Sequence, residues 1–375
     1  MQGFKATIRP VREVGSLEEK WRALEQRVQP SFFLGWDWAA TAIETSDDHL
    51  LVVEVLSGSE IVGLGLLAPM IEKRHGFLSV RQLRLNEVGR DSAHTVPIEF
   101  NSLLAEPEHQ SACWNALLLA LNQAEAPKWD EIVVTNALDS VEEGLSHKGL
   151  AIHRRAEMGS GIVDLEKLRS EGVNSYSGYV AMLGKSTRQQ LNRSIKLYEA
   201  RGPLTIDTAA TLEDAENYLQ EIINQHNAKW GALGKESQAV SDHNIDFQRR
   251  LIKRMIGQGG VELVRISAGD EAFAWVYNYI EAKRALYIMG GFKVEDDQRL
   301  KPGLVAHAVL IASHINAGRD VYDFLAGDGR YKLNLGQAGP AFTSFSIQRP
   351  SLALRVEKAL RKLKQRLATG AKKSG

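Results

Sequence analysis

The strongest constraint in this sequence is an order of elements that occurs twice. Residues 53–61 contain an apolar strand pattern, a short acidic turn with a glycine and a second apolar strand pattern, and residues 264–272 repeat this series. The two segments lie about 211 residues apart, whereas solenoid and propeller repeats have periods of about 20–50 residues. The pattern therefore predicts two domains of one fold and not a repeat array.

Hydrophobic periodicity supplies the elements of both halves. Apolar residues at helical spacing predict helices over 16–28, 36–44, 112–122, 140–147, 211–229, 245–257 and 303–317. Short alternating or continuous apolar runs predict strands over 50–56, 61–71, 78–86, 131–135, 151–155, 261–266, 271–280, 284–290 and 321–325. Strands and helices are intermixed in each half, so we expect an α/β protein in which layers of helices cover sheets.

Two glycines, Gly159 and Gly161, loosen the backbone between the two halves and mark the predicted domain boundary. We expect a first domain over residues 1–160 and a second domain over 161–347. A basic tail follows over 348–375. The second domain contains the candidate catalytic and binding residues that are described below, so it carries the predicted active site.

Composition excludes several classes of protein. The chain has 375 residues, of which 44% are hydrophobic and 25% charged, as in soluble globular proteins and unlike disordered or collagen-like chains. Its longest apolar run, 304–311, is far shorter than the ~20 residues that span a bilayer, and no secretory signal is visible at the N-terminus. Cys113 is the only cysteine and cannot form an internal disulfide, so we expect a cytoplasmic protein.

The charges are balanced overall, with 46 basic and 46 acidic residues, but they are unevenly distributed. Residues 349–375 contain nine Lys or Arg and one acid, so the rest of the chain carries a net charge of −8, which disfavours binding to nucleic acid. An apolar stripe at helical spacing in this tail consists of Val356, Leu360, Leu363 and Leu367. Such a helix can lie at the periphery of an anionic membrane, or its stripe can pack on the acidic body.

A helix start in the second half has the features of a phosphate-binding site. Pro302 and Gly303 open a long apolar helix after a polar loop, and the preceding strand ends in glycines. Free backbone N–H groups and the helix dipole converge at such a start, although an ordinary helix N-terminus has the same pattern. The predicted cofactor-binding residues are Met289, Gly290, Arg299, Lys301, Gly303 and Leu304.

A polar loop after a strand is the main candidate for catalysis. The strand at 321–325 leads into a glycine-bounded run that contains Asp328, Tyr331 and Lys332. Open α/β sheets bind ligands where their strands end, and loops carry functional residues more often than packed elements do. A solvated turn is the alternative explanation of the same residues.

Two predicted helices carry further candidates. His226 lies late on one of them with Trp230 one turn later, and histidine suits proton transfer near neutral pH, although a helix-end histidine also favours the dipole. Arg188 and Asn192 share one face of a basic helix, which either binds an anionic substrate or is a solvated surface.

Two histidines on the helix predicted at 303–317 do not indicate a metal centre. His307 and His314 lie seven residues apart, so they can share one side of the helix. No carboxylate or cysteine accompanies them at ligand spacing. We therefore predict that the protein binds no metal.

The order of these motifs resembles that of a known family, the CelD-type branch of the Gcn5-related N-acetyltransferases (GNAT), and more distantly the FemAB and FemX peptidoglycan aminoacyltransferases. The motifs are 188–193, His226 with Trp230, 302–303 and 324–332. The resemblance covers residues 10–345 and implies tandem GNAT-like domains, each a mixed, mostly antiparallel sheet flanked by helices. It also implies acetyl-CoA, or another acyl-CoA, as the donor.

The resemblance suggests roles for individual residues. Tyr331 would protonate the leaving thiolate, and Lys332 would neutralise negative charge. Asp328 would act as a base or orient Tyr331, and His226 is a second candidate base. The chain departs from the family in two places, because its phosphate loop has only one glycine and Ala326 stands where the family usually has an arginine. The first half contains no phosphate loop that we recognise.

Three functions remain open at this point. The first is an acyl-CoA-dependent acyltransferase, above all an N-acetyltransferase, whose acceptor is a sugar, an amino sugar or a small molecule; such proteins often accompany exopolysaccharide or envelope assembly. The second is a Fem-like aminoacyltransferase that uses charged tRNA, which the acidic body disfavours. The third is an inactive scaffold that keeps the GNAT fold in polysaccharide assembly.

Overall fold

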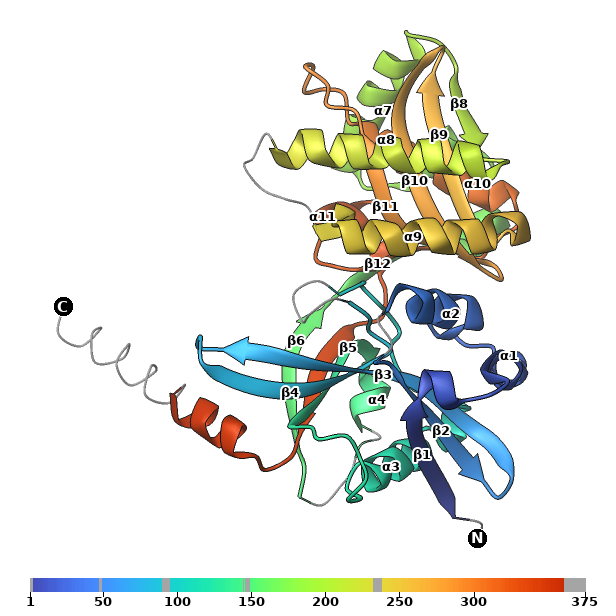
Figure 1. Ribbon diagram of the computed structural model, residues 1–375. Helices are drawn as coiled ribbons and strands as arrows, with labels where there is room; N and C mark the ends of the chain where they lie inside the picture. Colours follow the sequence, from blue (N-terminus) through green and yellow to red (C-terminus); the bar gives the residue numbers. More distant parts are fainter. Residues whose placement is uncertain are drawn as a thin grey trace, which may run out of the picture. The chain divides into compact units, whose positions relative to one another are not determined.

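The computed structural model describes residues 3–46, 49–89, 95–143, 145, 149–231 and 238–360, and it divides into two compact units (Figure 1). Unit 1 consists of the described residues up to Glu157 together with those from Phe342 onward, and unit 2 consists of Met158–Ala341. Each unit contains one seven-stranded sheet. Within the described residues, no helix is both long enough and apolar enough to cross a membrane.

Unit 1 has the strand order β1-β2-β3-β4-β5-β14-β6. Its strands are β1 (Phe4–Pro10), β2 (Leu51–Ser57), β3 (Glu60–Arg74), β4 (Leu78–Leu85), β5 (Glu131–Leu138), β6 (Ala151–Met158) and β14 (Phe342–Gln348). Its helices are α1 (Leu17–Val28), α2 (Trp36–Thr45), α3 (Gln110–Ala120) and α4 (Asp139–Glu143). Helix α3 packs on the sheet, where Trp114 is buried in one core with Trp129 and Phe345.

Unit 2 has the strand order β13-β7-β12-β11-β10-β9-β8. Its strands are β7 (Ser160–Asp164), β8 (Leu204–Thr208), β9 (Val261–Ala268), β10 (Glu271–Glu281), β11 (Arg284–Phe292), β12 (Val321–Ala326) and β13 (Gln337–Ala338). Its helices are α5 (Leu165–Ser170), α6 (Tyr176–Met182), α7 (Lys185–Glu199), α8 (Leu212–Gly231), α9 (Asp242–Met255), α10 (Pro302–Asn316) and α11 (Arg330–Leu335). The apolar α10 packs with α5, α6 and α7 on one face of the sheet, and α8 and α9 cross the other face (Figure 1).

The two sheets share one design in which each receives a strand from the other half of the chain. β7 follows β6 along the chain but pairs antiparallel with β12 and β13. β14 follows β13 along the chain but pairs antiparallel with β5. Exchanging β7 and β14 would make each sheet a continuous run of strands, so the repeated order of elements reflects two copies of one fold.

The predicted α/β fold, with tandem sheets that are mixed and mostly antiparallel, is confirmed. The strand exchange places residues 342–348 in unit 1, whereas the predicted second domain ran to residue 347. This difference arises because β14 bonds to β5, a long-range pairing that local periodicity does not encode. Of the predicted tail, residues 352–360 are helical, and Leu363 and Leu367 lie outside the described residues.

In unit 1, the neighbouring parallel strands β4 and β5 diverge after a short paired stretch, and another segment of unit 1 fills the gap between them. β4 and β5 pair over only three residues, Gln82 to Arg84 on β4. Beyond them, Asn101 donates its backbone N–H to the Asn136 carbonyl (N···O 3.3 Å) and its side-chain Nδ2 to the Leu85 carbonyl (2.9 Å). The gap between β4 and β5 is therefore closed by hydrogen bonds within unit 1.

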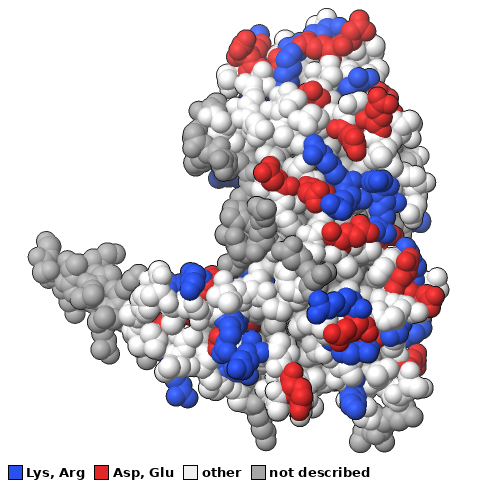
Figure 2. Space-filling model, in the orientation of Figure 1, with Lys and Arg blue, Asp and Glu red and all other residues white. Residues whose placement is uncertain are grey.

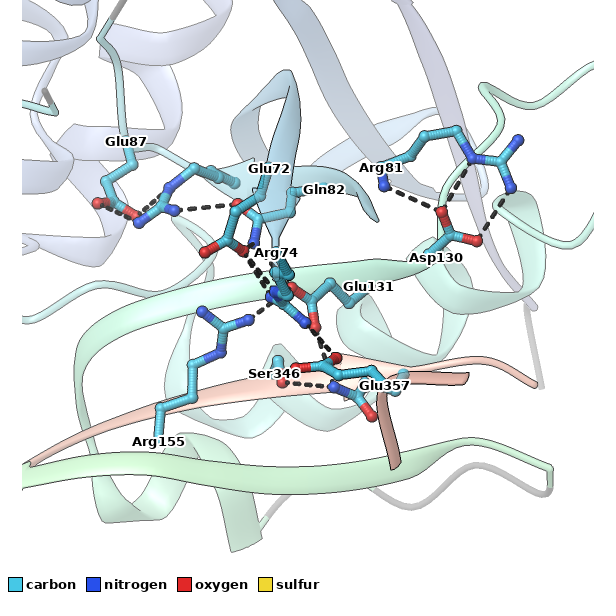
Figure 3. Close-up of polar contacts among 12 residues, drawn as sticks. Glu72, Arg74, Arg81, Gln82, Glu87, Asp130, Glu131, Arg155, Ser346 and Glu357 are labelled. Atoms are coloured by element: carbon cyan, nitrogen blue, oxygen red, sulfur yellow. Dashed lines mark hydrogen bonds and ion pairs between the residues drawn. The ribbon is translucent and has the colours of Figure 1, made fainter. Parts of the chain in front are cut away.

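A buried charged network lies on the sheet of unit 1 (Figure 3). Glu131 is fully buried and forms ion pairs with Arg74 and Arg155. It also accepts hydrogen bonds from Gln82 Nε2 (2.7 Å) and Gln348 Nε2 (2.9 Å), so strands β3, β4, β5, β6 and β14 all contribute. Burial raises the pKa of Glu131, but Arg155 and Arg74 outweigh it and hold the pKa below its usual range.

Replacing Glu131 with leucine should destabilise unit 1 by about 3 kcal/mol, because Arg155 then loses its carboxylate and Arg74 keeps only Glu72 and Glu357. The lowered pKa means that this stabilisation is present above the unfolded-state value of about 4.3 and is lost as the pH falls through the folded-state value. Urea unfolding followed by tryptophan fluorescence measures it, since five of the seven tryptophans lie in unit 1. Glu18→Leu, at an exposed pair with Arg22, should cost far less; equal costs would contradict the prediction.

Candidate active site

In unit 2, the parallel strands β11 and β12 diverge in the same way as β4 and β5 do in unit 1. β11 and β12 pair over three residues, Arg284 to Leu286 on β11. Ile288 has no partner in β10, which is the pattern of a bulge that bends the strand. Beyond Leu286 no backbone–backbone hydrogen bond joins β11 to any described segment other than β10. This strand end is therefore splayed away from β12, and no described segment bonds to the backbone edge that it leaves open.

A cavity of about 600 Å³ lies at this opening. It is lined by the end of β11, the start of α10, the end of α8 and the start of α11. The lining residues are Gln225, His226, Lys229, Trp230, Tyr287, Gly290, Phe292, Lys293, Val294, Lys301, Pro302, Gly303, Leu304, His307 and Tyr331. Aromatic side chains dominate the wall, three lysines contribute positive charge, and none of the described lining residues is an Asp or Glu.

The start of α10 presents free backbone donors to this cavity. The Lys301 N–H is already used, because it donates to the buried Ser194 Oγ of α7 (2.8 Å). Pro302 has no N–H, and the N–H groups of Gly303 and Leu304 have no acceptor among the described residues. Two donors and the positive end of a 15-residue helix therefore converge on the cavity.

Helix α8 brings His226 and Trp230 to the cavity because it approaches β11 closely. A Cβ atom on Gly291 would lie 2.7 Å from the Ile222 Cα atom, so only glycine permits this approach. Burial lowers the pKa of His226 below 6.5 and the nearby Lys229 adds to this, while a hydrogen bond with the Gly290 backbone opposes it. His226 is therefore a neutral imidazole at pH 7, which can accept a proton.

Tyr331 supplies a phenol to the cavity wall. Its ring stacks on that of His307 with 5.7 Å between centroids and 13° between planes, and its edge meets Phe324. Its hydroxyl has no hydrogen-bond partner among the described residues. Burial raises the pKa of Tyr331 to about 12, so the hydroxyl keeps its proton at neutral pH.

His307 is a second donor in the same wall. Its Nδ1 lies 3.0 Å from the Tyr322 hydroxyl, and burial with the charge of Lys332 lowers its pKa to about 3. The ring is therefore neutral. Its tautomer is set by Tyr322, because the buried Tyr322 hydroxyl has no other acceptor among the described residues. If Tyr322 donates to Nδ1, no buried O–H is left unpaired and the proton of His307 sits on Nε2.

The structure separates the remaining predicted residues from the cavity. Lys332 is buried and its Nζ donates to the carbonyls of Leu325 (2.9 Å) and Ala326 (2.7 Å), so it holds the end of β12. Asp328 accepts from the Gly159 N–H (3.3 Å) and orders the same loop. These contacts position Tyr331, and they are not contacts with a substrate in the cavity.

Four other predicted residues also lie outside the cavity lining. Met289 is buried in β11, and Arg299 is an exposed residue paired with Asp297. Arg188 donates to the Ala181 carbonyl (3.0 Å), and Asn192 is exposed on α7. Of the predicted set, the cavity lining contains His226, Trp230, Gly290, Lys301, Gly303, Leu304 and Tyr331.

His307 is the cavity residue that the sequence analysis missed as a catalytic candidate. The signal was visible, because it is a polar residue near the centre of an otherwise apolar helix and such residues need a buried partner. Considering only metal binding hid its pairing with Tyr322. Within the described part of the chain, no group of three or more His, Cys, Asp or Glu side chains is arranged to hold a metal ion.

Comparison with known proteins places the cavity in a recognised domain. Residues 185–333, which include every lining residue, match the family described as "Acetyltransferase (GNAT) domain". A comparison with curated proteins finds no match.

Two solved structures resemble the whole chain. FemX has a TM-score of 0.54 at 11% identity, covering 88% of this chain and 96% of that chain. L-PGS from Bacillus licheniformis has a TM-score of 0.52 at 11% identity, covering 91% of this chain and 94% of that chain. At these identities the likeness concerns the fold alone. Residues 185–333 of unit 2 thus match a GNAT domain, and the chain as a whole has a fold similar to that of FemX.

Proposed function

We propose that the protein is an acyltransferase that moves an acyl group, most simply acetyl, from acyl-CoA to an amine or hydroxyl of a sugar, an amino sugar or a small molecule. One observation carries the proposal. The gap between β11 and β12 is open and holds free N–H donors at the start of α10 together with a protonated phenol on α11. The CelD-type resemblance supports a cytoplasmic role in exopolysaccharide or envelope biosynthesis.

The donor would be held by the open strand edge and the helix start. The free N–H groups of Gly303 and Leu304 suit the pyrophosphate of coenzyme A, and the lining Lys301 adds positive charge, whereas Lys293 is paired with Glu271. The amide groups of the pantetheine arm can replace the partner strand that β11 lacks beyond Leu286. This arrangement requires neither a metal nor Lys332.

The chemical step needs a base, a donor for the carbonyl oxygen and a donor for the leaving sulfur. The acceptor nitrogen or oxygen attacks the thioester carbonyl carbon, the C–S bond breaks, and the acceptor's proton passes through neutral His226 to the sulfur. Tyr331, with a pKa of about 12, is too weak an acid to give its proton away fully. It would donate a hydrogen bond to the sulfur as negative charge develops there.

We assign to His307 the role of hydrogen-bond donor to the thioester carbonyl oxygen. A neutral imidazole with its proton on Nε2 donates a hydrogen bond without adding a charge that must be desolvated, and Tyr322 fixes the ring on its other side. Because the pKa of His307 is about 3, the ring stays neutral throughout the reaction.

The alternative functions fit the cavity less well. An aminoacyl group carries an ammonium ion, whereas the described lining contains lysines and no carboxylate. A tRNA-binding surface should also be basic, and acidic and basic side chains are intermixed on the face shown in Figure 2. An inactive scaffold has no need of an open gap when unit 1 shows that the same fold can close it.

Gly303→Glu should abolish coenzyme A binding, because it sets a carboxylate beside the phosphate-binding donors. A Cβ atom on Gly303 would make ordinary contacts with Phe292, 3.5 Å away, so the change should leave the fold intact. Calorimetry should show at least a ~100-fold weaker Kd, about 2.7 kcal/mol. Gly303→Ala is the matched control and should bind as the unchanged protein does. Equal affinity of a folded Gly303→Glu variant would contradict this site.

Tyr331→Phe and His307→Phe should each lower kcat by about 10²-fold with little change in donor Kd, because each removes one donor used in the transition state. A thiol-release assay across acyl-CoA donors and amine, amino-sugar and alcohol acceptors measures turnover. Tyr176→Phe, whose hydroxyl pairs with Glu199 on unit 2 outside the cavity, is the matched control and should behave as the unchanged protein.

The same assay separates the three functions. Coenzyme A binding with no turnover on any acceptor would favour the scaffold. Transfer from charged tRNA with no coenzyme A binding would favour the aminoacyltransferase. Near-normal kcat in Tyr331→Phe would remove that phenol from the mechanism.

A further inference from the structure

We propose that the helix at 352–360 and the tip of the β3–β4 hairpin form a surface of unit 1 that binds anionic phospholipid membranes. This inference does not depend on the proposed reaction. It rests on the orientation of the helix, on cations that have no ion-pair partner among the described residues, and on apolar side chains that are exposed beside them.

The helix is attached to unit 1 through the buried Glu357, and its apolar stripe is only partly covered. Glu357 is 5% exposed, and its Oε2 accepts from Arg74 Nη1 (2.8 Å) at the edge of the charged network (Figure 3). At 100° per residue, Leu352 and Val356 lie on another side of the helix. Leu352 is 79% exposed and Val356 is 36% exposed. In the described part of the stripe, Val356 is exposed and Leu360 is half-buried, so this side of the helix is only partly covered.

The cations on this helix and just before it differ from those in the rest of unit 1. Arg349, Arg355 and Lys358 form no ion pair with any described residue. Most arginines elsewhere in unit 1 are paired with carboxylates, among them Arg9, Arg22, Arg27, Arg74, Arg81, Arg84, Arg154 and Arg155. The sequence after residue 360 adds six Lys or Arg and no acid. This charge is complementary to an anionic lipid surface.

The hairpin tip adds an aromatic side chain that the tail lacks. Phe77 is 67% exposed in the turn between β3 and β4, and Arg74, three residues earlier, makes the ion pair to Glu357. The tip and the helix are therefore neighbours, as Figure 1 also shows. Exposed aromatic and leucine side chains beside lysines and arginines are the composition of surfaces that enter the lipid headgroup region.

A hollow beside Leu352 offers a place for a lipid phosphate. It has a volume of about 530 Å³, and its lining includes Arg81, Arg349, Ser351 and Leu352. Arg81 is held by Asp130, whereas the Arg349 guanidinium lies over the Trp129 ring (5.2 Å) with no carboxylate partner among the described residues. A phosphate bound at Arg349 would place its acyl chains beside the exposed Leu352.

Co-sedimentation of the full chain with vesicles tests the proposal. At low salt the protein should bind vesicles of phosphatidylglycerol and phosphatidylcholine and not vesicles of phosphatidylcholine alone. Binding should be lost near 1 M salt, where charges are screened beyond about 3 Å. Leu352→Ser with Val356→Ser should weaken binding by about tenfold, and Arg355→Glu with Lys358→Glu should weaken it by more.

Matched changes elsewhere separate this surface from general effects. Leu119→Ser with Met182→Ser alters apolar side chains that are about as exposed, and Lys253→Glu with Lys283→Glu makes the same change of charge in unit 2. Both controls should bind as the unchanged protein does. The proposal is overturned if the protein ignores anionic vesicles, or if the controls lose as much binding as the surface variants. Equal binding to a soluble polyanion, or conversion of a dimer to a monomer by the serine variant, would also overturn it.

Discussion

The divergence of β11 and β12 after three residue pairs is the constraint on which the candidate site depends. Backbone groups that leave a strand ladder need other partners, because unpaired buried N–H and C=O groups are costly. Unit 1 meets this demand internally, through Asn101 bridging Leu85 and Asn136. In unit 2 no described segment occupies the gap, and a cavity lined with lysines, aromatic rings and helix-start donors lies there. The same fold thus occurs twice in the chain, once with the gap between the diverging strands closed and once with that gap open.

Because of the strand exchange, the two units cannot fold independently of each other. β7 completes the sheet of unit 2 although it directly follows β6 of unit 1, and β14 completes unit 1 although it directly follows β13 of unit 2. Neither sheet can therefore form from one continuous half of the chain. β14 also carries Gln348 to Glu131, so the buried charged network of unit 1 forms only when the end of the chain has returned. Such non-local pairings raise contact order and slow folding.

Local sequence signals predicted much of this structure and failed where long-range contacts decide. Periodicity gave the repeated element order, the α/β class and the helix start at Pro302, because these depend on neighbours along the chain. It gave no sign of the strand exchange. Lys332 lies in the loop that was the main candidate for catalysis, but its side chain is buried against two carbonyls. The direction of this side chain is set by the path of the chain after β12. His307 was missed because its role depends on Tyr322, which lies on a different element.

The number of coenzyme A molecules bound per chain tests the central claim most directly. Native mass spectrometry of the full chain at increasing coenzyme A concentration measures this number without any assumption about the acceptor. One open gap and one closed gap predict saturation at one coenzyme A per chain. Saturation at two would show that unit 1 also opens, and no binding at all would show that the cavity beside β11 serves another ligand.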